Sequence, residues 1–257
     1  MLLRPPQPRM AVDMPLDALF HSVSGTLLNA ATVFAGALLG LLFGARLPTR
    51  VQETFFVAIG LVVVLLGLRD ALTTHNLLVL LASMLLGGLC GELAHIEDGL
   101  ERAGNWLQKH LARPGSTFSE GFVTASLVFC VGPLSILGAL DNGLRGDITD
   151  LALKAALDGI SAIAFAATLG WGVLFSGLVI LAYQGAISLG AQAVQPLVSA
   201  YPAAIVELNA AGGLILVALG IKLLKLRELR VANFLPALLI APLLTALLSS
   251  SWPQLFT

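Results

Sequence analysis

The chain has 257 residues, of which 57% are hydrophobic and 11% are charged, and its formal net charge is −1. A soluble globular domain has about 25% charged residues, so this composition predicts an integral membrane protein. The nearly neutral charge argues against nucleic acid as a partner. The two cysteines, Cys90 and Cys130, fall in apolar runs and match no metal-binding or disulfide spacing.

Eight apolar runs of membrane-spanning length follow a polar, Pro-rich tail over residues 1–20, which we expect to be disordered. A helix needs about 20 apolar residues to cross the hydrocarbon core of a bilayer. The runs occupy residues 24–45, 54–69, 76–94, 119–140, 152–170, 172–196, 205–224 and 232–250. The fifth and sixth nearly merge at Gly170-Trp171-Gly172, so seven spans are the alternative. The sequence therefore predicts an all-α polytopic helix bundle, a single transmembrane domain over residues 21–257.

A polar insert over residues 96–118 separates the third run from the fourth. Ile96, Leu100, Ala103 and Leu107 recur within it at helical intervals. One apolar face on an otherwise charged segment is typical of a helix that lies in the membrane interface. We therefore expect an amphipathic interfacial helix in this insert.

Of the fourteen lysines and arginines, nine fall on one side of an eight-span bundle and four on the other, with Lys154 inside a span. Cytoplasmic loops carry an excess of positive charge. This distribution predicts that both termini are outside and that the basic loop Lys222–Arg230 is cytoplasmic. A seven-span bundle would reverse the prediction for one terminus.

Two segments with the same glycine spacing resemble each other, Gly60 to Arg69 and Gly213 to Lys222. They lie in the second and seventh spans, which cross in opposite directions, as an inverted-topology repeat requires. A rival match pairs Asn29-Ala-Ala with Asn209-Ala-Ala and would relate the first and seventh spans in parallel. Both readings of an internal repeat stay open at this point.

Small residues recur every four positions on two of the predicted helices. In a membrane such stripes allow two helix backbones to approach closely. The partner helix can belong to the same chain or to another subunit of a homo-oligomer. The stripes are Gly36, Gly40 and Gly44 in the first span, and Ser83, Gly87 and Gly91 in the third.

The fifth run contains two charged residues one helical turn apart, Lys154 and Asp158. A carboxylate at the centre of a span costs about 2.5–3.5 kcal/mol, whereas a strongly apolar residue returns only about 0.3–0.6 kcal/mol. The charged face should therefore turn inward, toward neighbouring helices. Because intramembrane ionisable residues mark ion and solute pathways, we predict a substrate or ion site at Asp158 and Lys154. The alternative is a structural ion pair near the end of the helix.

Two of the predicted spans are interrupted by proline. Gly132-Pro133 breaks the fourth span, and Pro236 and Pro242 break the eighth. Proline removes a backbone donor, and pairs of interrupted helices accompany transport sites. The alternative is a proline kink without function.

The connection after the fourth span is rich in oxygen-bearing side chains and glycine. Asp141, Asn142 and Asp147 lie in it. Carboxylate and amide oxygens suit a hard cation, although the spacing matches no calcium-binding loop. The alternative is a polar turn between two helices.

Four further polar residues are candidate ligands for an ion or solute. Asn29 carries an amide that both donates and accepts within the first span. Glu92 ends the third span, where a solvated helix end is the alternative. Glu207 and Asn209 enter the seventh span, where an acid also complements the helix dipole.

Signatures of enzymes are missing from the sequence. It contains no His-Glu-x-x-His zinc motif, no Gly-x-Ser-x-Gly nucleophile turn and no phosphate-binding Walker loop. We therefore expect a protein that is not an enzyme and needs no cofactor.

The chain resembles domain-of-unknown-function family 554, the YqgA-like prokaryotic membrane proteins, over nearly everything from Gly25 onward. The resemblance implies a multi-pass protein of the bacterial inner membrane, and it is most specific around the fourth and fifth spans. The segments that carry it are Gly25 to Ala31, Gly36 to Gly40, Arg46 to Pro48, Phe129 to Gly132, Ile136 to Ala139, Asp141 to Asp147, Lys154 to Gly159, Gly212 to Leu216 and Asn233 to Leu238.

Together these features favour a secondary transporter or channel for a cation or small solute, with Asp158 as the binding carboxylate. The alternative is a membrane scaffold or sensor that uses the insert at 96–118 and the basic loop Lys222–Arg230. The two differ in whether Asp158 or the exposed charges matter for function.

Overall fold

The computed structural model describes residues 16–44, 48–111, 117–131 and 133–251, and these form helices without strands. The predicted all-helical architecture is confirmed. Most of the predicted tail lies outside the described residues, and the first helix begins at Leu16, before that tail was expected to end. The elements are α1 (Leu16–Gly44), α2 (Thr49–Ala71), α3 (Leu77–Leu93), α4 (Ile96–Leu111), α5 (Phe118–Cys130), α6 (Pro133–Arg145), α7 (Thr149–Leu169), α8 (Gly172–Ala200), α9 (Pro202–Leu223), η2 (Val231–Phe234) and α10 (Ala237–Ser251).

Five stretches of the described chain are long and apolar enough to cross a membrane alone: α1, α7, α8, α9, and η2 together with α10. Two bent pairs, α3 with α4 and α5 with α6, pass the same test jointly and raise the number to seven. The range of five to seven spans includes the predicted alternative of seven. The predicted eight additionally requires α2, a helix of 23 residues.

The predicted break in the fourth span is present. α5 ends at Cys130, α6 begins at Pro133, and the two helices are bent by 61°. Gly132 itself lies outside the described residues. In the eighth span, Pro236 precedes α10 and Pro242 lies within it. The fifth and sixth spans are separate helices, because Gly170 at the end of α7 adopts a positive φ of 77° that favours glycine.

The insert at 96–118 does form a helix, α4, which turns away from α3 by 54°. Its first turn carries Glu97 and Asp98, and its last turn carries Lys109 and His110. This distribution of charge complements the helix dipole. Whether α4 lies along the membrane interface stays a prediction, since α3 and α4 together also qualify as one broken span.

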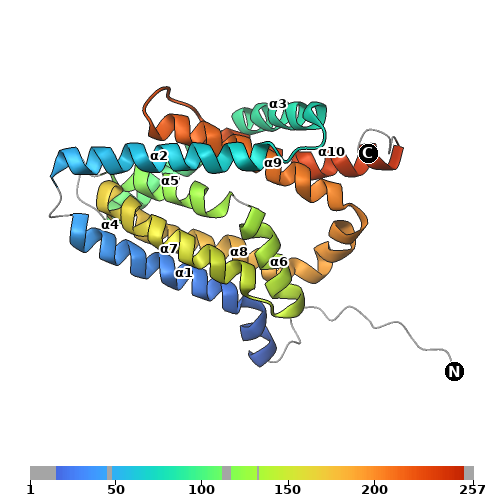
Figure 1. Cartoon of the computed structure of the whole chain (residues 1–257), viewed down its shortest axis with the longest axis horizontal. Helices are drawn as coiled ribbons and strands as arrows, with labels where there is room; N and C mark the ends of the chain where they lie inside the picture. Colours follow the sequence, from blue (N-terminus) through green and yellow to red (C-terminus); the bar gives the residue numbers. More distant parts are fainter. Residues whose placement is uncertain (1–15, 45–47, 112–116, 132, 252–257) are drawn as a thin grey trace.

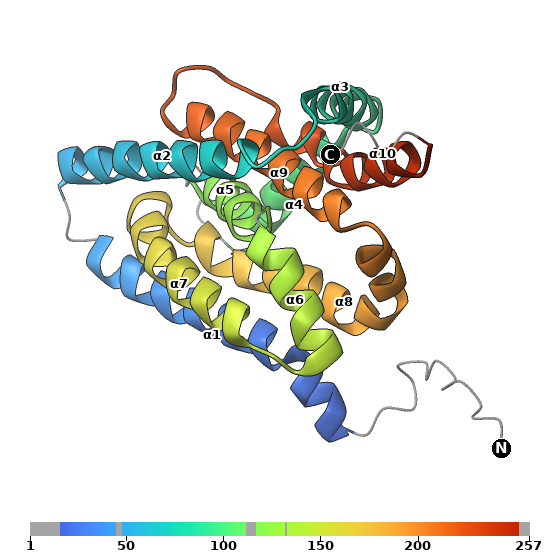
Figure 2. The same ribbon diagram turned by 45° about the vertical axis from the view of Figure 1, so that its right-hand side comes forward.

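The glycine stripe of α1 packs against α7, and the two helices run parallel, side by side in Figures 1 and 2. A side chain at Gly36 would overlap the carbonyl of Gly159, and one at Gly40 would overlap that of Ile163. The stripe of α3 packs in the same way against η2 and α10, where Gly87 meets Ala237. Both stripes thus have partners within the chain, and a homo-oligomer built through them stays a prediction.

Three antiparallel helix pairs repeat in the same order along the chain: α1 with α8, α2 with α9, and α3 with α10. The resembling glycine segments face each other in the second pair, with Gly60 beside Gly220 and Gly67 beside Gly213. An inverted three-helix repeat produces this order. The antiparallel course of α2 and α9 agrees with the inverted match, and the repeat itself stays a prediction.

The helices form two groups. In both views α1 and α7 lie on one side, α2 and α9 lie on the other, and the broken pair α5 and α6 passes between them (Figures 1 and 2). The main core contains Phe129 of α5, Phe165 of α7 and Ile215 of α9. The helix break is therefore held at the centre of the bundle, where it can meet polar residues from several helices.

Candidate functional site

Lys154 and Asp158 form a buried ion pair on the inward face of α7. The Lys154 Nζ lies 2.7 Å from the Asp158 Oδ2, and the two residues are only 6% and 7% exposed. The opposite face of the helix carries Leu153, Leu157 and Ile160, all more than half exposed. Residues four apart share a helix face, so the predicted inward orientation of this charged face is confirmed.

Asn29 joins this ion pair from α1. Its Nδ2 donates to Asp158 Oδ2 at 3.1 Å and to Gln184 Oε1 on α8 at 3.3 Å. The residue is fully buried, yet its Oδ1 has no hydrogen-bond partner. The same is true of the hydroxyl of Thr26, three residues earlier on α1. A buried acceptor, Asn29 Oδ1, therefore lies without a partner on a side chain that is bonded to the Asp158 carboxylate.

The network continues from Gln184 to the helix break. Gln184 Nε2 donates to the Ser135 hydroxyl at 2.9 Å, and that hydroxyl donates to the carbonyl of Phe129 at 3.2 Å. In an unbroken helix the Phe129 carbonyl would accept from residue 133, but proline has no N–H. Ser135 supplies the missing donor. A continuous hydrogen-bonded chain thus joins the ion pair to the broken pair α5 and α6.

Gln184 and Ser135 are network members that the sequence analysis missed. Both are uncharged and fully buried. A neutral polar residue in an apolar run costs far less than a charge, so it gives a weak signal in the sequence. The usable signal for Ser135 was its position two residues after the proline, where a hydroxyl can bond a freed carbonyl.

Three ligands were predicted in the connection after the fourth span, but Asp141 and Asn142 lie in the last turns of α6, and only Asp147 lies between α6 and α7. Asn142 is fully buried and inserts into α1: its Oδ1 accepts from the Gly25 N–H at 3.1 Å, and its Nδ2 donates to the His21 carbonyl at 3.0 Å. The Gly25 N–H and the His21 carbonyl are four residues apart in α1, so the Asn142 amide bridges one turn of that helix. Asp141 lies 3.7 Å from Arg145. The Asn142 bonds connect α6 to α1, and the contact between Asp141 and Arg145 lies within the last turn of α6.

Asp147 caps the start of α7. Its Oδ1 accepts from the Thr149 N–H at 2.9 Å and from the Thr149 hydroxyl at 2.7 Å. The backbone N–H, followed by the hydroxyl, lowers the pKa of the Asp147 carboxyl below its ordinary value of 3.8. The arrangement matches the polar-turn alternative for this loop.

Glu207 is fully buried in α9 and binds the connection between α2 and α3. Its carboxylate accepts from the Thr74 hydroxyl at 2.6 Å and from the backbone N–H groups of His75 and Asn76 at 2.7 and 3.0 Å. Asn76 in turn caps the first turn of α3. Asn209, two residues further on, has a buried Oδ1 without a partner.

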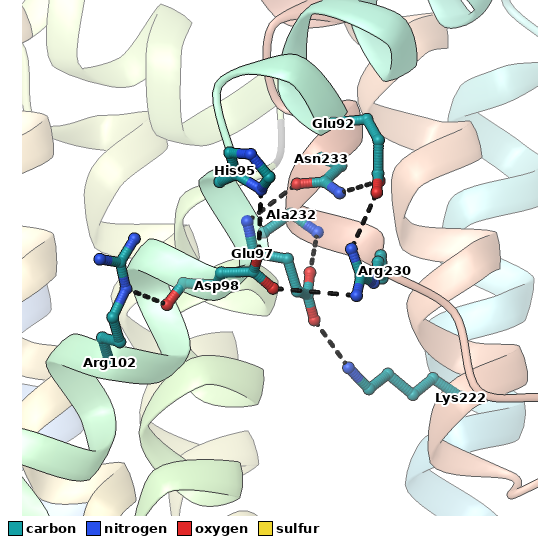
Figure 3. A network of polar contacts seen from close by, with 9 residues as sticks. All are labelled: Glu92, His95, Glu97, Asp98, Arg102, Lys222, Arg230, Ala232 and Asn233. Atoms are coloured by element: carbon teal, nitrogen blue, oxygen red, sulfur yellow. Dashed lines mark hydrogen bonds and ion pairs between the residues drawn. The ribbon is translucent and has the colours of Figure 1, made fainter.

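Glu92 belongs to a second polar network, in which α3, α4, α9 and the segment around η2 meet (Figure 3). Its carboxylate accepts from Arg230 at 2.8 Å and from Asn233 Nδ2 at 2.5 Å. The centre of the network is Glu97, which is 3% exposed and binds Lys222 at 2.9 Å and the Ala232 N–H at 2.6 Å. Glu97 was not among the predicted ligands, because it looked like an ordinary first-turn acid of an exposed helix.

The predicted site residues therefore fall into separate groups. Lys154, Asp158, Asn29 and the break at Pro133 come together. Other parts of the molecule hold Glu92, Glu207, Asp141, Asn142 and Asp147. Within the described residues, no three histidine, cysteine, aspartate or glutamate side chains cluster as a metal site. The first group offers one carboxylate, one ammonium and neutral amides.

The family described as "Protein of unknown function (DUF554)" matches residues 24–246. The chain belongs to this family. It is 33% identical to the "Uncharacterized membrane protein YdfK" of Bacillus subtilis (strain 168), over 85% of this chain and 93% of that protein. It is 31% identical to the "Uncharacterized protein YqgA" of Escherichia coli (strain K12), over 87% of this chain and 97% of that protein. No solved structure matches the chain.

Proposed function

We propose that this DUF554 protein is a small secondary transporter or channel, and that the Lys154–Asp158 network is its binding site for a cation or small solute. The observation that carries this proposal is the hydrogen-bonded chain from a buried carboxylate to a broken helix. In membrane transport proteins, discontinuous helices line binding sites, because freed backbone groups survive at membrane depth only beside protein or water.

The chemistry of the network favours a cation over an anion. Oxygens dominate it: the Asp158 carboxylate, the Gln184 and Asn29 amide oxygens and the hydroxyl of Ser135. A buried acceptor that lacks a partner costs about 1–3 kcal/mol, and Asn29 Oδ1 is such an acceptor. A bound cation would supply the missing interaction.

The membrane placement belongs to the same proposal. The protein is a multi-pass protein of the bacterial inner membrane, with both termini outside and the basic loop Lys222–Arg230 in the cytoplasm. Reporter domains fused to either end test this orientation: activity of a periplasmic reporter at both ends supports it, and activity at one end alone contradicts it.

The second candidate function is a membrane scaffold or sensor that acts through α4 and the loop Lys222–Arg230. The observation that favours it is the network of Figure 3, which concentrates charge where α4 meets the segment around η2. In that case, neutralising exposed charges of α4, such as Glu101 and Arg102, would abolish function. Asp158→Asn would lower the stability of the protein and leave its function intact.

The deciding experiment compares the wild-type protein with Asp158→Asn in thermal unfolding and in flux from liposomes, over sodium, potassium, calcium, magnesium and pH. A ligand that binds only the folded state stabilises it by about 2.7 kcal/mol at 100 times its Kd. We expect one cation to raise the melting temperature of the wild type and to be transported, and Asp158→Asn to abolish both effects.

Asp147→Asn is the matched control, because Asp147 is an exposed acid that introduces the same helix. It should retain both effects. Normal flux through folded Asp158→Asn would refute the assignment of this site.

A further inference from the structure

We infer that the Lys154 ammonium is a tethered substitute for the transported ion, and that the substrate class is small monovalent cations. The ammonium occupies the place on Asp158 that the ion takes, and it withdraws when the ion binds. This inference rests on the proposed function and specifies its substrate.

The position of the ammonium is that of a ligand. Lys154 Nζ lies 2.7 Å from Asp158 Oδ2, and the Asn29 amide bonds the same oxygen at 3.1 Å. A lysine ammonium is a compact point charge on a flexible stem, so an alkali cation or a primary ammonium can replace it on a carboxylate. Asn29 Oδ1, which is buried and without a partner, adds a neutral oxygen from the adjoining helix.

The charge of the site sets the valence of its ligand. Lys154 and Asp158 together are neutral, and the network contains no second carboxylate. A cation that entered beside Lys154 would leave an uncompensated positive charge in the bundle, which costs several kcal/mol. When Lys154 withdraws, the single carboxylate balances one monovalent ion, whereas a divalent ion would again leave an excess charge.

Lys154 has a route out of the site. It is the sixth residue of α7, so about 7–8 Å of helix rise separates it from the first residue, Thr149. Residues 145–149 are exposed. Lysine side chains of this depth can extend along the helix and keep their charge at the membrane interface. The ammonium can therefore leave Asp158 without a change in the backbone.

The test measures the apparent Kd for sodium, potassium and methylammonium chlorides by thermal shift at one fixed pH, with calcium chloride as the divalent comparison. Lys154→Gln removes the tethered competitor, so we expect at least tenfold tighter binding of a monovalent cation. Lys154→Arg keeps a charge that pairs with carboxylates at least as well, so it should bind no tighter than the wild type. A folded Lys154→Gln protein that binds equally or more weakly overturns the inference.

A second measurement uses the wild type alone and does not depend on how a variant folds. Labelling of Lys154 with a water-soluble amine reagent, followed by mass spectrometry, should rise as potassium or sodium saturates the site. Labelling that stays constant or falls across the same range overturns the inference.

The two proposals fail in different ways. If a monovalent cation stabilises the wild type but not Asp158→Asn, and Lys154→Gln binds no tighter, the site stands and the tethered competitor is wrong. If no cation stabilises either the wild type or Lys154→Gln, the tethered competitor is wrong and so is the assignment of a cation to this site.

Discussion

Glu97 and Asp158 are both buried carboxylates paired with a lysine, but only Glu97 has a hydrogen-bond donor for each of its oxygens in the network around it. Each oxygen of Glu97 has its own donor, Lys222 on one and the Ala232 N–H on the other. Both hydrogen bonds to Asp158 end on the same oxygen, Oδ2, and the neighbouring Asn29 keeps a buried oxygen without a partner. One site is fully satisfied, and the other is not.

This difference separates a structural role from a working one. A buried polar network stabilises a fold when every member is bonded, and a partly satisfied network is worse than an apolar core. The Glu97 network joins α4 to the end of α9 and to η2, as Figure 3 shows. The Asp158 network leaves the buried Asn29 oxygen unpaired. Proteins keep such a loss of stability where function needs it.

The largest effect on stability should come from breaking the satisfied network. Glu97→Ala leaves Lys222 without its partner and the buried Ala232 N–H without an acceptor, so we expect a loss of about 3 kcal/mol. Thermal unfolding in detergent would show a fall of several degrees in melting temperature. Glu101→Ala, an exposed acid one turn along α4, should leave the melting temperature nearly unchanged. Equal melting of the two variants would contradict the structural role of Glu97.

Replacing both charges of each pair sharpens the comparison, because the two double variants should change the free energy of unfolding in different directions. Lys154→Met with Asp158→Leu removes a charged pair and leaves Asn29 bonded to Gln184, so we expect a change between zero and a gain of about 1–3 kcal/mol. Glu97→Leu with Lys222→Met still leaves the Ala232 N–H unsatisfied and should lose about 1–3 kcal/mol. Thermal unfolding of both proteins under one condition measures the difference, and the reverse order would refute it.

Gln184→Leu should have a smaller effect on stability, about 1 kcal/mol, because Asn29 and Ser135 each keep another partner. Its informative effect is on coupling. Since Gln184 is the link between the ion pair and the helix break, cation binding to the wild type should increase amide-exchange protection around residues 127–138. Gln184→Leu should lose that response and Gln192→Leu, an exposed position on the same helix, should keep it. A retained response in Gln184→Leu would show that this link does not carry the coupling.

Sequence patterns predicted the parts of this molecule that depend on hydrophobicity and charge along one helix. The apolar runs located α1, α7, α8, α9 and α10, and the cost of a buried carboxylate oriented the face with Asp158 inward. Proline chemistry located the break between α5 and α6. These features follow from local rules, so they can be read without knowing which helices are neighbours.

The parts that depend on helix neighbours could not be predicted in the same way. Glu207 and Asn142 looked like ligands, yet one binds the connection after α2 and the other binds the backbone of α1. Nothing in the local pattern of Glu97 distinguished it from the exposed Glu101. Each of these roles is decided by a partner more than 100 residues away, as the pairing of Glu97 with Lys222 illustrates.

The smallest expected effect comes from Asp147, an exposed carboxylate that serves as a baseline for the two buried ones. Because its pKa is lowered in the folded protein, its stabilising contribution is present above the ordinary aspartate pKa of 3.8 and is lost as the pH falls through the folded-state value. Asp147→Ala should therefore melt slightly below the wild type near neutral pH, and the gap should close under strongly acidic conditions. Asp147→Asn keeps an acceptor for the Thr149 N–H and should show a smaller gap that does not depend on pH. A gap for Asp147→Ala that stays constant down to low pH would mean that capping by the charged carboxylate contributes nothing to the start of α7.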